Sequence, residues 1–302
     1  MKPLIKNSVY SMDLHEFKLF RSLVHERTGI WLRDGKHVML ASRLSRRLRH
    51  HGLTSFAEYY ELVRKMTIDE EEIRQLINCV TTNKTSFFRE RHHFQFLSQT
   101  VAPQVQSAVA RGAAQGIRVW SAACSTGEEP YSISITLLEA LQRAQGGRTM
   151  VRSKSAASAA WTIEVVASDI DTAVLDTARR AVYRDESLET VDIPLQSRYF
   201  LRGKDDMQGF VKVKPDVSRL VQFMNINLMD ARWPLDGLFD VIFFRNALIY
   251  FTHETQDVFL RKMAHYLKPN GYLFLGNSEH IPWLREIFTP LTQTMYQLRS
   301  RE

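Results

Sequence analysis

The sequence contains little cysteine and no hydrophobic run long enough to cross a membrane. Its two cysteines, Cys79 and Cys124, show no spacing typical of metal ligands, so neither a disulfide framework nor a zinc site is indicated, and we expect no metal. Every apolar run falls far short of the ~20 residues of a transmembrane helix, and "MKPLIKNSVYSM" at the start lacks the apolar centre of a signal peptide. These absences predict a cytoplasmic protein that does not insert into a membrane.

The composition is that of an ordinary globular protein with an excess of positive charge. Hydrophobic residues make up 44% of the 302 residues and charged residues 24%, and the formal net charge is +7. A chain of this length can hold two domains. The positive charge favours an acidic partner, which could be a nucleic acid or an acidic protein surface, and charge alone does not choose between them.

The first part of the chain, residues 1–88, is predicted to be an all-helical domain. In "SMDLHEFKLFRSLVHERTGI", Asp13 and Glu16 have the spacing of a capping box, and Gly29 is placed to end the helix. "TSFAEYYELVRKM" and "DEEEIRQLINCVTTN" predict two further helices. The apolar positions of the first helix are expected to share one face: Leu14, Phe17, Phe20 and Val24.

A strongly basic helix is predicted within this part, over "GKHVMLASRLSRRLRHHG". Ala41, Leu44 and Leu48 are expected to face inward. The basic residues on or near the opposite side are Arg43, Arg46, Arg47, Arg49 and His50. Such a face is either a docking surface for an acidic partner or simply a solvated helix surface, and the pattern allows both.

The remainder, residues 89–302, alternates between short apolar strands and helices. The expected strands are "IRVWSAA", "TIEVVASD", "VQFMNINL", "FDVIFFRN" and "GYLFLGNSE". The helical segments between several of them are "PYSISITLLEALQ", "DTAVLDTARRAVY" and "ETQDVFLRKMAHYLKP". Continuous apolar strands joined by helices predict an α/β domain with a doubly wound, mostly parallel sheet, which binds ligands outside the carboxyl ends of its strands.

Two segments interrupt this alternation. "RAQGGRTMVRSKSAASAA", residues 143–160, is polar and basic and is expected to be a surface loop whose role the sequence does not indicate. Residues 187–223 are expected to form a small inserted antiparallel β-subdomain. Its predicted strands are "RYFLR" and "FVKVK", with "VQF" as a candidate third strand.

The turn after the first strand, "WSAACSTGEEPY", lacks the GxGxxG pattern of a dinucleotide site. Its small residues still allow a ligand to approach the backbone, and Gly127 can adopt an unusual dihedral angle. Glu128 and Glu129 open the following helix, where a pyrophosphate would prefer bare amides. The two acids suit a cationic ligand such as S-adenosylmethionine, although acids at a helix start also simply favour the helix dipole.

Polar residues end the next two strands. Asp169 ends the second strand, where nucleotide-binding sheets place an acid that accepts hydrogen bonds from ribose hydroxyls. Asp171 competes for this role, but its position suits it better to cap the following helix. The third strand ends in "NINLMD", where Asn227 and Asp230 are near the expected place of an adenine ring.

The fourth strand ends in "RNALIYF", and Arg245 and Asn246 are difficult to explain there as packing residues. Arginine is costly to bury without a partner, so its position directly after an apolar strand indicates a functional site. DNA amino-methyltransferases often carry Asn-Pro-Pro-Tyr at this location. The absence of those prolines weakens the nucleic-acid alternative.

Taken together, these residues resemble the CheR-type chemoreceptor glutamate methyltransferases over nearly the whole chain. The most specific elements are "TTNKTSFFRE", "WSAACSTGEEPYSI", "ASDIDTAVLDTA", "RYFLRG" and "RNALIYF", in the order of that family. The resemblance implies a helical domain joined to a Rossmann-like class-I methyltransferase domain with a β-subdomain. It also implies methyl transfer from S-adenosylmethionine, with S-adenosylhomocysteine as product, to glutamate side chains on the cytoplasmic helices of chemotaxis receptors.

The resemblance also implies roles for individual residues. Arg89 and Tyr250 match the positions nearest to the methyl transfer, and Glu129 and Asp169 those that hold the methionine part and the ribose. The full set implied for cofactor binding is Asn83, Thr85, Arg89, Glu129, Asp169, Asn227, Leu228, Arg245 and Asn246. Receptor binding is assigned to Arg43, Arg46 and Arg47 on the basic helix and, for a receptor C-terminal peptide, to Arg202 and Lys212 of the β-subdomain.

Three other functions remain open from the sequence. The chain could be a class-I methyltransferase that acts on another protein or on nucleic acid, or a cofactor-binding signalling adaptor without activity. Arg89, Arg245 and Tyr250 argue against the inactive adaptor. An NAD-dependent oxidoreductase is disfavoured because the two acids at the helix start suit a cation better than a pyrophosphate.

Overall fold

The computed structural model describes residues 10–68, 70–144 and 162–300 of the chain. It divides into two compact units, a helical unit made of Met1–Thr82 with Tyr250–Thr252, and an α/β unit made of Asn83–Ile249 and His253–Glu302. The basic loop expected at 143–160 lies, beyond its first two residues, outside the described residues. Among the helices that are described, none has the length and apolar character needed to span a membrane.

The helical unit contains the four helices that the sequence predicts. They are α1 (Leu14–Thr28), α2 (His37–His51), α3 (Phe56–Val63) and α4 (Glu71–Val80). The capping box is confirmed, because the Glu16 N–H donates to Asp13 Oδ1 at 2.7 Å and the Asp13 N–H donates to Glu16 Oε2 at 2.9 Å. Gly29 ends α1 in the left-handed conformation, with φ of 74°.

One expected core residue of α1 is exposed. Phe17, Phe20 and Val24 are buried as predicted, but 65% of Leu14 is exposed. Leu14 is the first residue of α1 and stands at the edge of its apolar face, so its side chain reaches water. In α2 the inward positions are confirmed, since Ala41, Leu44 and Leu48 are all buried.

The arginines of α2 differ in their surroundings. Arg43 donates to the backbone carbonyls of Cys79, Val80 and Thr81, where α4 ends. Arg47 is paired with the buried Glu72 of α4, which also accepts hydrogen bonds from Tyr59 and contacts His51. Arg43 and Arg47 therefore tie α2 to α4.

Of the five basic residues that the sequence places on this face, the other three face solvent. Arg46, Arg49 and His50 are exposed. The basic face of α2 thus has two parts, a half-buried pair of arginines with structural partners and an exposed group of three basic side chains. Only the exposed group has the character of a solvated or docking surface.

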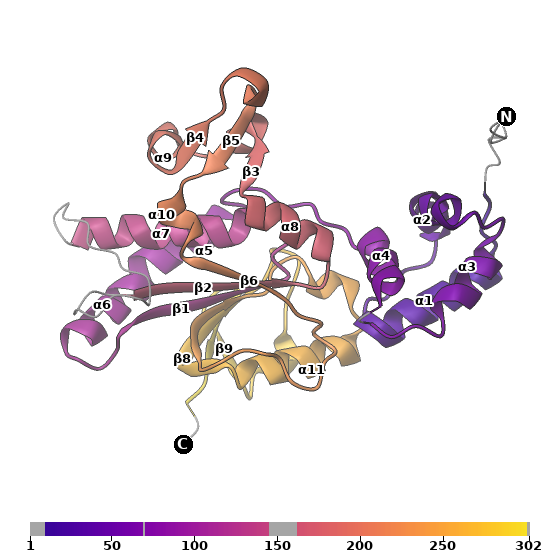
Figure 1. Ribbon diagram of the computed structural model, residues 1–302. Helices are drawn as coiled ribbons and strands as arrows, with labels where there is room; N and C mark the ends of the chain where they lie inside the picture. The colour runs from indigo at the N-terminus through magenta and orange to yellow at the C-terminus, as the bar shows by residue number, and fades with distance from the viewer. Residues whose placement is uncertain (1–9, 69, 145–161, 301–302) are drawn as a thin grey trace. The chain divides into compact units, whose positions relative to one another are not determined.

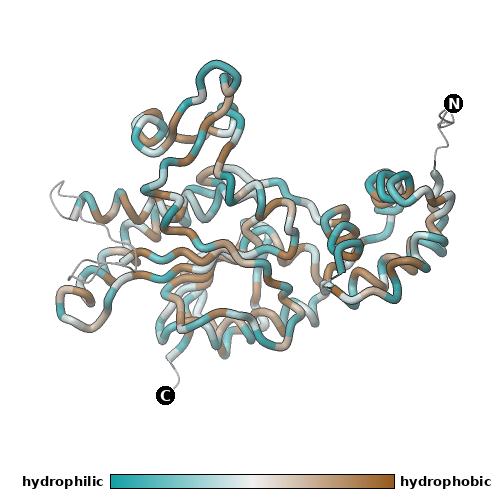
Figure 2. The backbone as a smooth tube through the Cα atoms, viewed as in Figure 1, coloured by the Kyte–Doolittle hydropathy of each residue, from teal (hydrophilic) through white to brown (hydrophobic). Residues whose placement is uncertain are grey.

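A seven-stranded sheet organises the α/β unit (Figure 1). Its order is β6-β2-β1-β7-β8-β10-β9, in which β6, β2, β1, β7 and β8 run parallel and β10 pairs antiparallel with β8 and β9. The bounds are β1 (Gly116–Ala122), β2 (Thr162–Asp169), β6 (Val221–Asn225), β7 (Phe239–Phe243), β8 (Leu267–Phe274), β9 (Phe288–Pro290) and β10 (Met295–Leu298). Hydrophobic residues run continuously through the central strands (Figure 2), as expected for a sheet that is covered on both faces.

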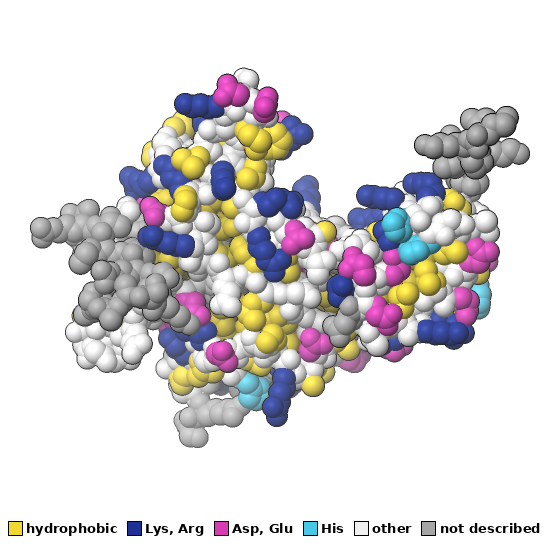
Figure 3. Space-filling model, viewed as in Figure 1, with side chains coloured by type: hydrophobic (Ala, Val, Ile, Leu, Met, Phe, Trp, Pro, Cys, Tyr) yellow, Lys and Arg dark blue, Asp and Glu magenta, His cyan; other side chains and the backbone are white. Residues whose placement is uncertain are grey.

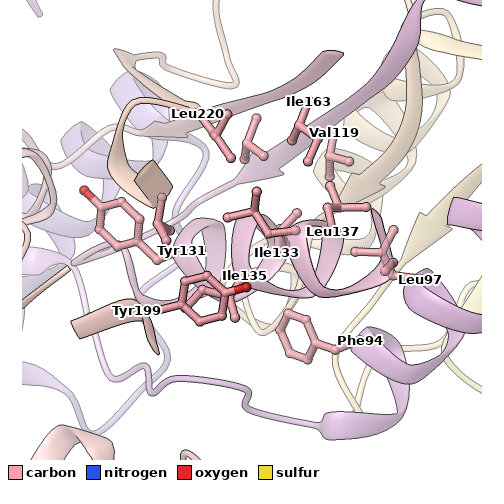
Figure 4. Packing of buried hydrophobic residues seen from close by; sticks show 14 of the residues in the cluster. Phe94, Leu97, Val119, Tyr131, Ile133, Ile135, Leu137, Ile163, Tyr199 and Leu220 are labelled. Carbon is pink, nitrogen blue, oxygen red and sulfur yellow. The ribbon is translucent and has the colours of Figure 1, made fainter. Parts of the chain in front are cut away.

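Helices cover both faces of this sheet. Figure 1 shows α7 (Glu128–Ala144) and α8 (Thr172–Arg180) on one side and α11 (His253–Ala264) on the other. Between α7 and the sheet, Leu137 packs near Val119 and Ile163, and Phe94 and Leu97 close the same core from α5 (Arg91–Phe96) and the π-turn Leu97–Val101 (Figure 4). The other short elements are α6 (Ala102–Ala110) and the 3-10 turns Asp185–Leu188, Asp205–Met207, Leu248–Tyr250 and Pro282–Leu284.

The inserted subdomain has three strands, but its third strand is not the one expected. Its sheet has the order β3-β5-β4, made of β3 (Val182–Arg184), β4 (Phe200–Arg202) and β5 (Phe210–Val213). The helices α9 (Ile193–Tyr199) and α10 (Pro215–Ser218) adjoin it.

The candidate strand "VQF" belongs instead to β6, at the edge of the main sheet, where Val221 pairs with Val165 of β2. The prediction that helix α8 continues through "AVY" was also wrong. Ala181 ends α8 in the left-handed conformation with φ of 55°, so the chain leaves the helix and begins β3 at Val182.

Candidate functional site

The turn after β1 is tightly folded against β2. The Cys124 N–H donates to the Ser168 carbonyl at 2.9 Å, and the Ser125 N–H donates to Asp169 Oδ2 at 2.8 Å. Gly127 has φ of 97°, and a Cβ there would lie 2.8 Å from the Cβ of Ala178 in α8. This confirms that the turn requires glycine at position 127.

Asp169 is a buried acid at the end of β2. Oδ2 accepts the Ser125 N–H, and Oδ1 accepts the Asp171 N–H at 3.0 Å. Burial raises the pKa of Asp169 to about 6. Each carboxylate oxygen can accept two hydrogen bonds. Asp169 can therefore still accept hydrogen bonds from hydroxyl groups of a ligand.

Asp171 has the capping role that the sequence predicts. Its Oδ1 accepts the N–H groups of Ala173 and Val174 at the start of α8, at 2.9 and 3.2 Å. Its Oδ2 accepts a hydrogen bond from the Asn83 side-chain amide at 2.8 Å. The backbone carbonyl of Asn83 accepts one from the Ser125 hydroxyl at 2.9 Å. Asn83 therefore contacts the residues that follow both β1 and β2.

A buried arginine forms the centre of the site. Only 1% of the Arg245 side chain is exposed, and it lies directly after β7. Its Nη1 donates to Glu129 Oε2 at 2.9 Å, and its Nη2 donates to Glu90 Oε2 at 2.9 Å and to the Arg89 carbonyl. Arg245 can therefore lie buried after an apolar strand, because it has two carboxylate partners.

The two acids of this Arg245 cluster, which consists of Arg245, Glu90 and Glu129, respond differently to burial. Burial raises the pKa of Glu129, although Arg245 and the Ser121 hydroxyl, at 2.7 Å, act in the opposite direction. Burial is also the largest influence on Glu90 and acts to raise its pKa, but Arg245 and the hydrogen bonds from Asn277 and Asn246 together outweigh it, so the pKa is lowered. With both acids ionised the cluster carries one net negative charge, which suits a cationic ligand.

The other residues implied for cofactor binding lie on neighbouring loops of the α/β unit. Thr85 is half-buried, and Arg89 donates from Nη1 to the Lys84 carbonyl at 3.0 Å. Asn227, which follows β6, is buried and accepts the Met229 N–H on Oδ1 at 3.0 Å. Leu228 is partly exposed beside it.

Asn246 is held from two sides. Its side-chain amide donates to Glu90 Oε1 at 3.3 Å, and its backbone N–H donates to Glu279 Oε2 at 2.8 Å. Its φ of 59° is in the left-handed region, which asparagine tolerates better than most residues. Tyr250 belongs to the helical unit, where its carbonyl accepts the Trp31 N–H at 2.7 Å.

Sequence reasoning assigned no role to Glu90 or Glu279. Glu90 is the last residue of "TTNKTSFFRE", and the only signal for it was its place in that motif. Glu279 follows the apolar strand β8 in "GNSE", where an acid after a buried strand was the available signal. Both contact the Arg245–Asn246 pair, which lies far from them in sequence.

The whole chain is similar to known methyltransferases. Residues 83–297 match the family model described as CheR methyltransferase, SAM binding domain, and residues 15–81 match CheR methyltransferase, all-alpha domain. Chemotaxis protein methyltransferase 2 of Pseudomonas aeruginosa is 40% identical over 296 residues, covering 97% of this chain and 96% of that protein. Chemotaxis protein methyltransferase of Escherichia coli is 41% identical over 286 residues, covering 95% and 91%.

Solved structures are similar at a greater distance. One is magnesium protoporphyrin IX methyltransferase from Synechocystis PCC 6803 with bound SAM, which is 17% identical, with a TM-score of 0.33 and coverage of 77% of this chain and 92% of that one.

We expect S-adenosylhomocysteine to bind more weakly as the pH falls through about 6. The pKa of Asp169 in the folded protein, about 6, lies above its ordinary value of 3.8, so the acid becomes protonated in this range and loses acceptor capacity for ribose hydroxyls. Asp169→Asn should weaken binding by about 1.5–3 kcal/mol at pH 7.5 and remove the part of this pH dependence that comes from Asp169. Isothermal titration calorimetry between pH 5 and 7.5 measures both effects.

Asp176→Asn is the matched control, because Asp176 is an exposed acid of α8 paired with Arg179. It should bind like the parent protein. Equal affinity of the parent and Asp169→Asn proteins at pH 7.5 would remove Asp169 from the site.

Proposed function

Because the chain belongs to the family of CheR methyltransferases, we propose that it is a protein-glutamate O-methyltransferase that esterifies glutamate side chains on the cytoplasmic helices of chemoreceptors. The family and its cofactor, S-adenosylmethionine, are given by matches to both domains along nearly the whole chain. The structural observation that supports the proposal is the buried Arg245 cluster, whose net negative charge lies beside the ends of β1 and β7. We propose the cytoplasm as its place of action.

The residues at the strand ends fit this cofactor. When bound, S-adenosylmethionine supplies a methyl group on a positively charged sulfonium. The Arg245 cluster offers the negative charge that suits this cation, and Asp169 offers acceptors for the ribose. Asn227 and Leu228 would border the adenine, and Asn83, Thr85, Arg89, Arg245 and Asn246 would complete the pocket.

The protein needs no general base for this reaction. A glutamate carboxylate has an ordinary pKa of about 4.3 and is therefore already ionised and nucleophilic at neutral pH. The task of the protein is to align that carboxylate, and alignment can contribute on the order of 7–11 kcal/mol. We assign the alignment to the hydroxyl of Tyr250, because a phenol orients a carboxylate without withdrawing as much charge from it as a guanidinium does.

Arg89 has two possible partners in this scheme. Its guanidinium carries five N–H donors, and one N–H at Nη1 binds the Lys84 carbonyl. It can bind the carboxylate of the substrate or that of the cofactor, and either role places it beside the methyl transfer.

The proposed product is a methyl ester on glutamate, and its chemistry provides the test. The purified protein, labelled S-adenosylmethionine and a helical receptor fragment should give label that alkali releases as volatile methanol, with mass spectrometry placing it on glutamate. Tyr250→Phe should lower kcat about tenfold or more while S-adenosylhomocysteine affinity stays unchanged. Label that resists alkali would exclude the ester, and absence of turnover would favour an inactive cofactor-binding adaptor.

The exposed part of the α2 basic face is proposed to dock on the receptor. Arg46→Glu combined with Arg49→Glu should raise KM for the receptor fragment at low salt and leave kcat and cofactor affinity unchanged, because both side chains are exposed. Steady-state kinetics measure the effect. The control is Lys18→Glu, which also reverses an exposed positive charge but lies on α1.

The sequence also assigns Arg43 and Arg47 to receptor binding. Their partners lie within the helical unit, so substitutions there would disturb α2 and α4 as well as any docking. Unchanged receptor KM in the Arg46 and Arg49 double variant would make the exposed face a solvated surface only.

The β-subdomain is proposed to bind a C-terminal receptor peptide. β4 is an edge strand of its sheet, where an extended peptide could add by backbone hydrogen bonds. Lys and Arg side chains gather over this subdomain (Figure 3), which would suit a peptide that ends in a carboxylate. Arg202 is the last residue of β4, and one of its N–H groups donates to the side-chain oxygen of Gln196. Lys212 is exposed on β5.

A synthetic receptor tail peptide should bind the intact protein in calorimetry, and Arg202→Ala or Lys212→Ala should weaken that binding. The effect should shrink as salt is added, because both charges are exposed. If the peptide does not bind, Arg202 serves instead to protect the edge strand β4 from aggregation, and the methyltransferase assignment is unaffected.

A further inference from the structure

A buried acid outside the proposed site holds the loop that carries Arg245 and Asn246. Glu279 lies after β8, and only 3% of it is exposed. Its Oε2 accepts the backbone N–H of Asn246 at 2.8 Å and that of Gly276 at 2.6 Å. One carboxylate oxygen thus joins the loop after β7 to the loop after β8.

The atoms around this oxygen are packed so closely that residue 276 has no space for a side chain. A Cβ at Gly276 would lie 2.4 Å from Asn246 Nδ2 and 2.8 Å from both the Asn246 nitrogen and Glu279 Oε2. Asn246 itself is in the left-handed conformation, which is unfavourable for a residue with a side chain unless its surroundings enforce it. The hydrogen bond from its N–H to Glu279 is one of the contacts that do so.

Backbone groups of the loop after β7 also act on the Glu279 carboxylate as a whole. Within residues 10–68, 70–144 and 162–300, Glu279 Oε1 is buried and has no hydrogen-bond partner. Burial raises the pKa of Glu279, while the backbone groups of Gly276, Asn246, Ile249 and Leu248 act to lower it. The carboxylate therefore faces the backbone of the whole loop that follows Arg245.

We infer that Glu279 is a positioning residue, whose buried carboxylate fixes the left-handed turn at Asn246 and so presents Arg245 and Asn246 to the cofactor. On the other side of the turn, the Asn246 side chain donates to Glu90 of the Arg245 cluster. The loop is thus held by Glu279 through its backbone and by Glu90 through a side chain. This inference rests on the proposed role of Asn246 in cofactor binding.

The test is a double-mutant cycle on S-adenosylhomocysteine binding, measured by calorimetry on the full chain. Glu279→Ala and Asn246→Ala should each weaken binding by about tenfold, as expected for loss of a hydrogen bond to a charged group or of the contact that it positions. The double variant should also bind S-adenosylhomocysteine only about tenfold more weakly than the parent, because both changes remove the same contact. Glu279→Gln should bind within about threefold of the parent, because the amide oxygen can accept both N–H groups.

Glu286→Ala is the matched control, because Glu286 is an exposed acid of the same C-terminal segment, paired with Arg261. It should bind normally. If Glu279→Ala does not fold, Glu279→Asp retracts the carboxylate by one methylene and serves in its place.

Three results would overturn the inference, and they can be distinguished from one another. If Asn246→Ala weakens binding and Glu279→Ala does not, Glu279 has no positioning role and the proposed function stands. If Asn246→Ala binds normally, the assignment of Asn246 to the cofactor site fails and the inference fails with it. Equal losses in the Glu279→Gln and Glu279→Ala proteins would also contradict it, because the loss would then not depend on the acceptor oxygen.

Discussion

The burial of one guanidinium, that of Arg245, is the constraint on which the site depends. Arginine does not lose its proton in a protein, so a buried arginine requires anionic partners. Glu90 comes from the start of α5, Glu129 from the start of α7 and Arg245 from the end of β7. Satisfying this single charge therefore brings together three segments that lie far apart in sequence. The same requirement produces the net negative charge that suits a sulfonium.

Unfavourable backbone conformations gather around this cluster, and hydrogen bonds compensate for them. Phe88, Glu90, Ala123, Ser125 and Asn246 all have positive φ, which costs on the order of 1–3 kcal/mol for a residue with a side chain. The Phe88 N–H donates to Ser132 Oγ at 2.9 Å, and the Ser125 N–H donates to Asp169. Each of these bonds also fixes a loop at the carboxyl end of the sheet. The same contacts thus stabilise the strained turns and the loops that carry the candidate site.

Patterns within short segments predicted the five parallel strands of the main sheet, the capping box of α1 and the turn at Gly127, because each depends on neighbouring residues. The antiparallel strands β9 and β10 were not predicted. The partners of Arg245 could not be predicted in this way, since Glu90 is 155 residues from it in sequence. The same holds for Arg47, whose placement on a basic face gave no indication of Glu72 in α4. The β3 strand was missed because three residues after a helix carry too little periodicity to be distinguished from its continuation.

The charges of this protein perform two different electrostatic tasks. The Arg245 cluster is buried, so salt screens it little and its geometry is fixed. Arg46 and Arg49 are exposed, and exposed charges act mainly on the rate and orientation of encounter with an acidic partner. In the proposed mechanism, the buried negative cluster would hold the cationic cofactor and the exposed positive charge would attract an anionic substrate. Because these two proposed tasks use separate residues, the requirement of a cationic cofactor for negative charge and that of an acidic substrate for positive charge do not fall on the same side chains.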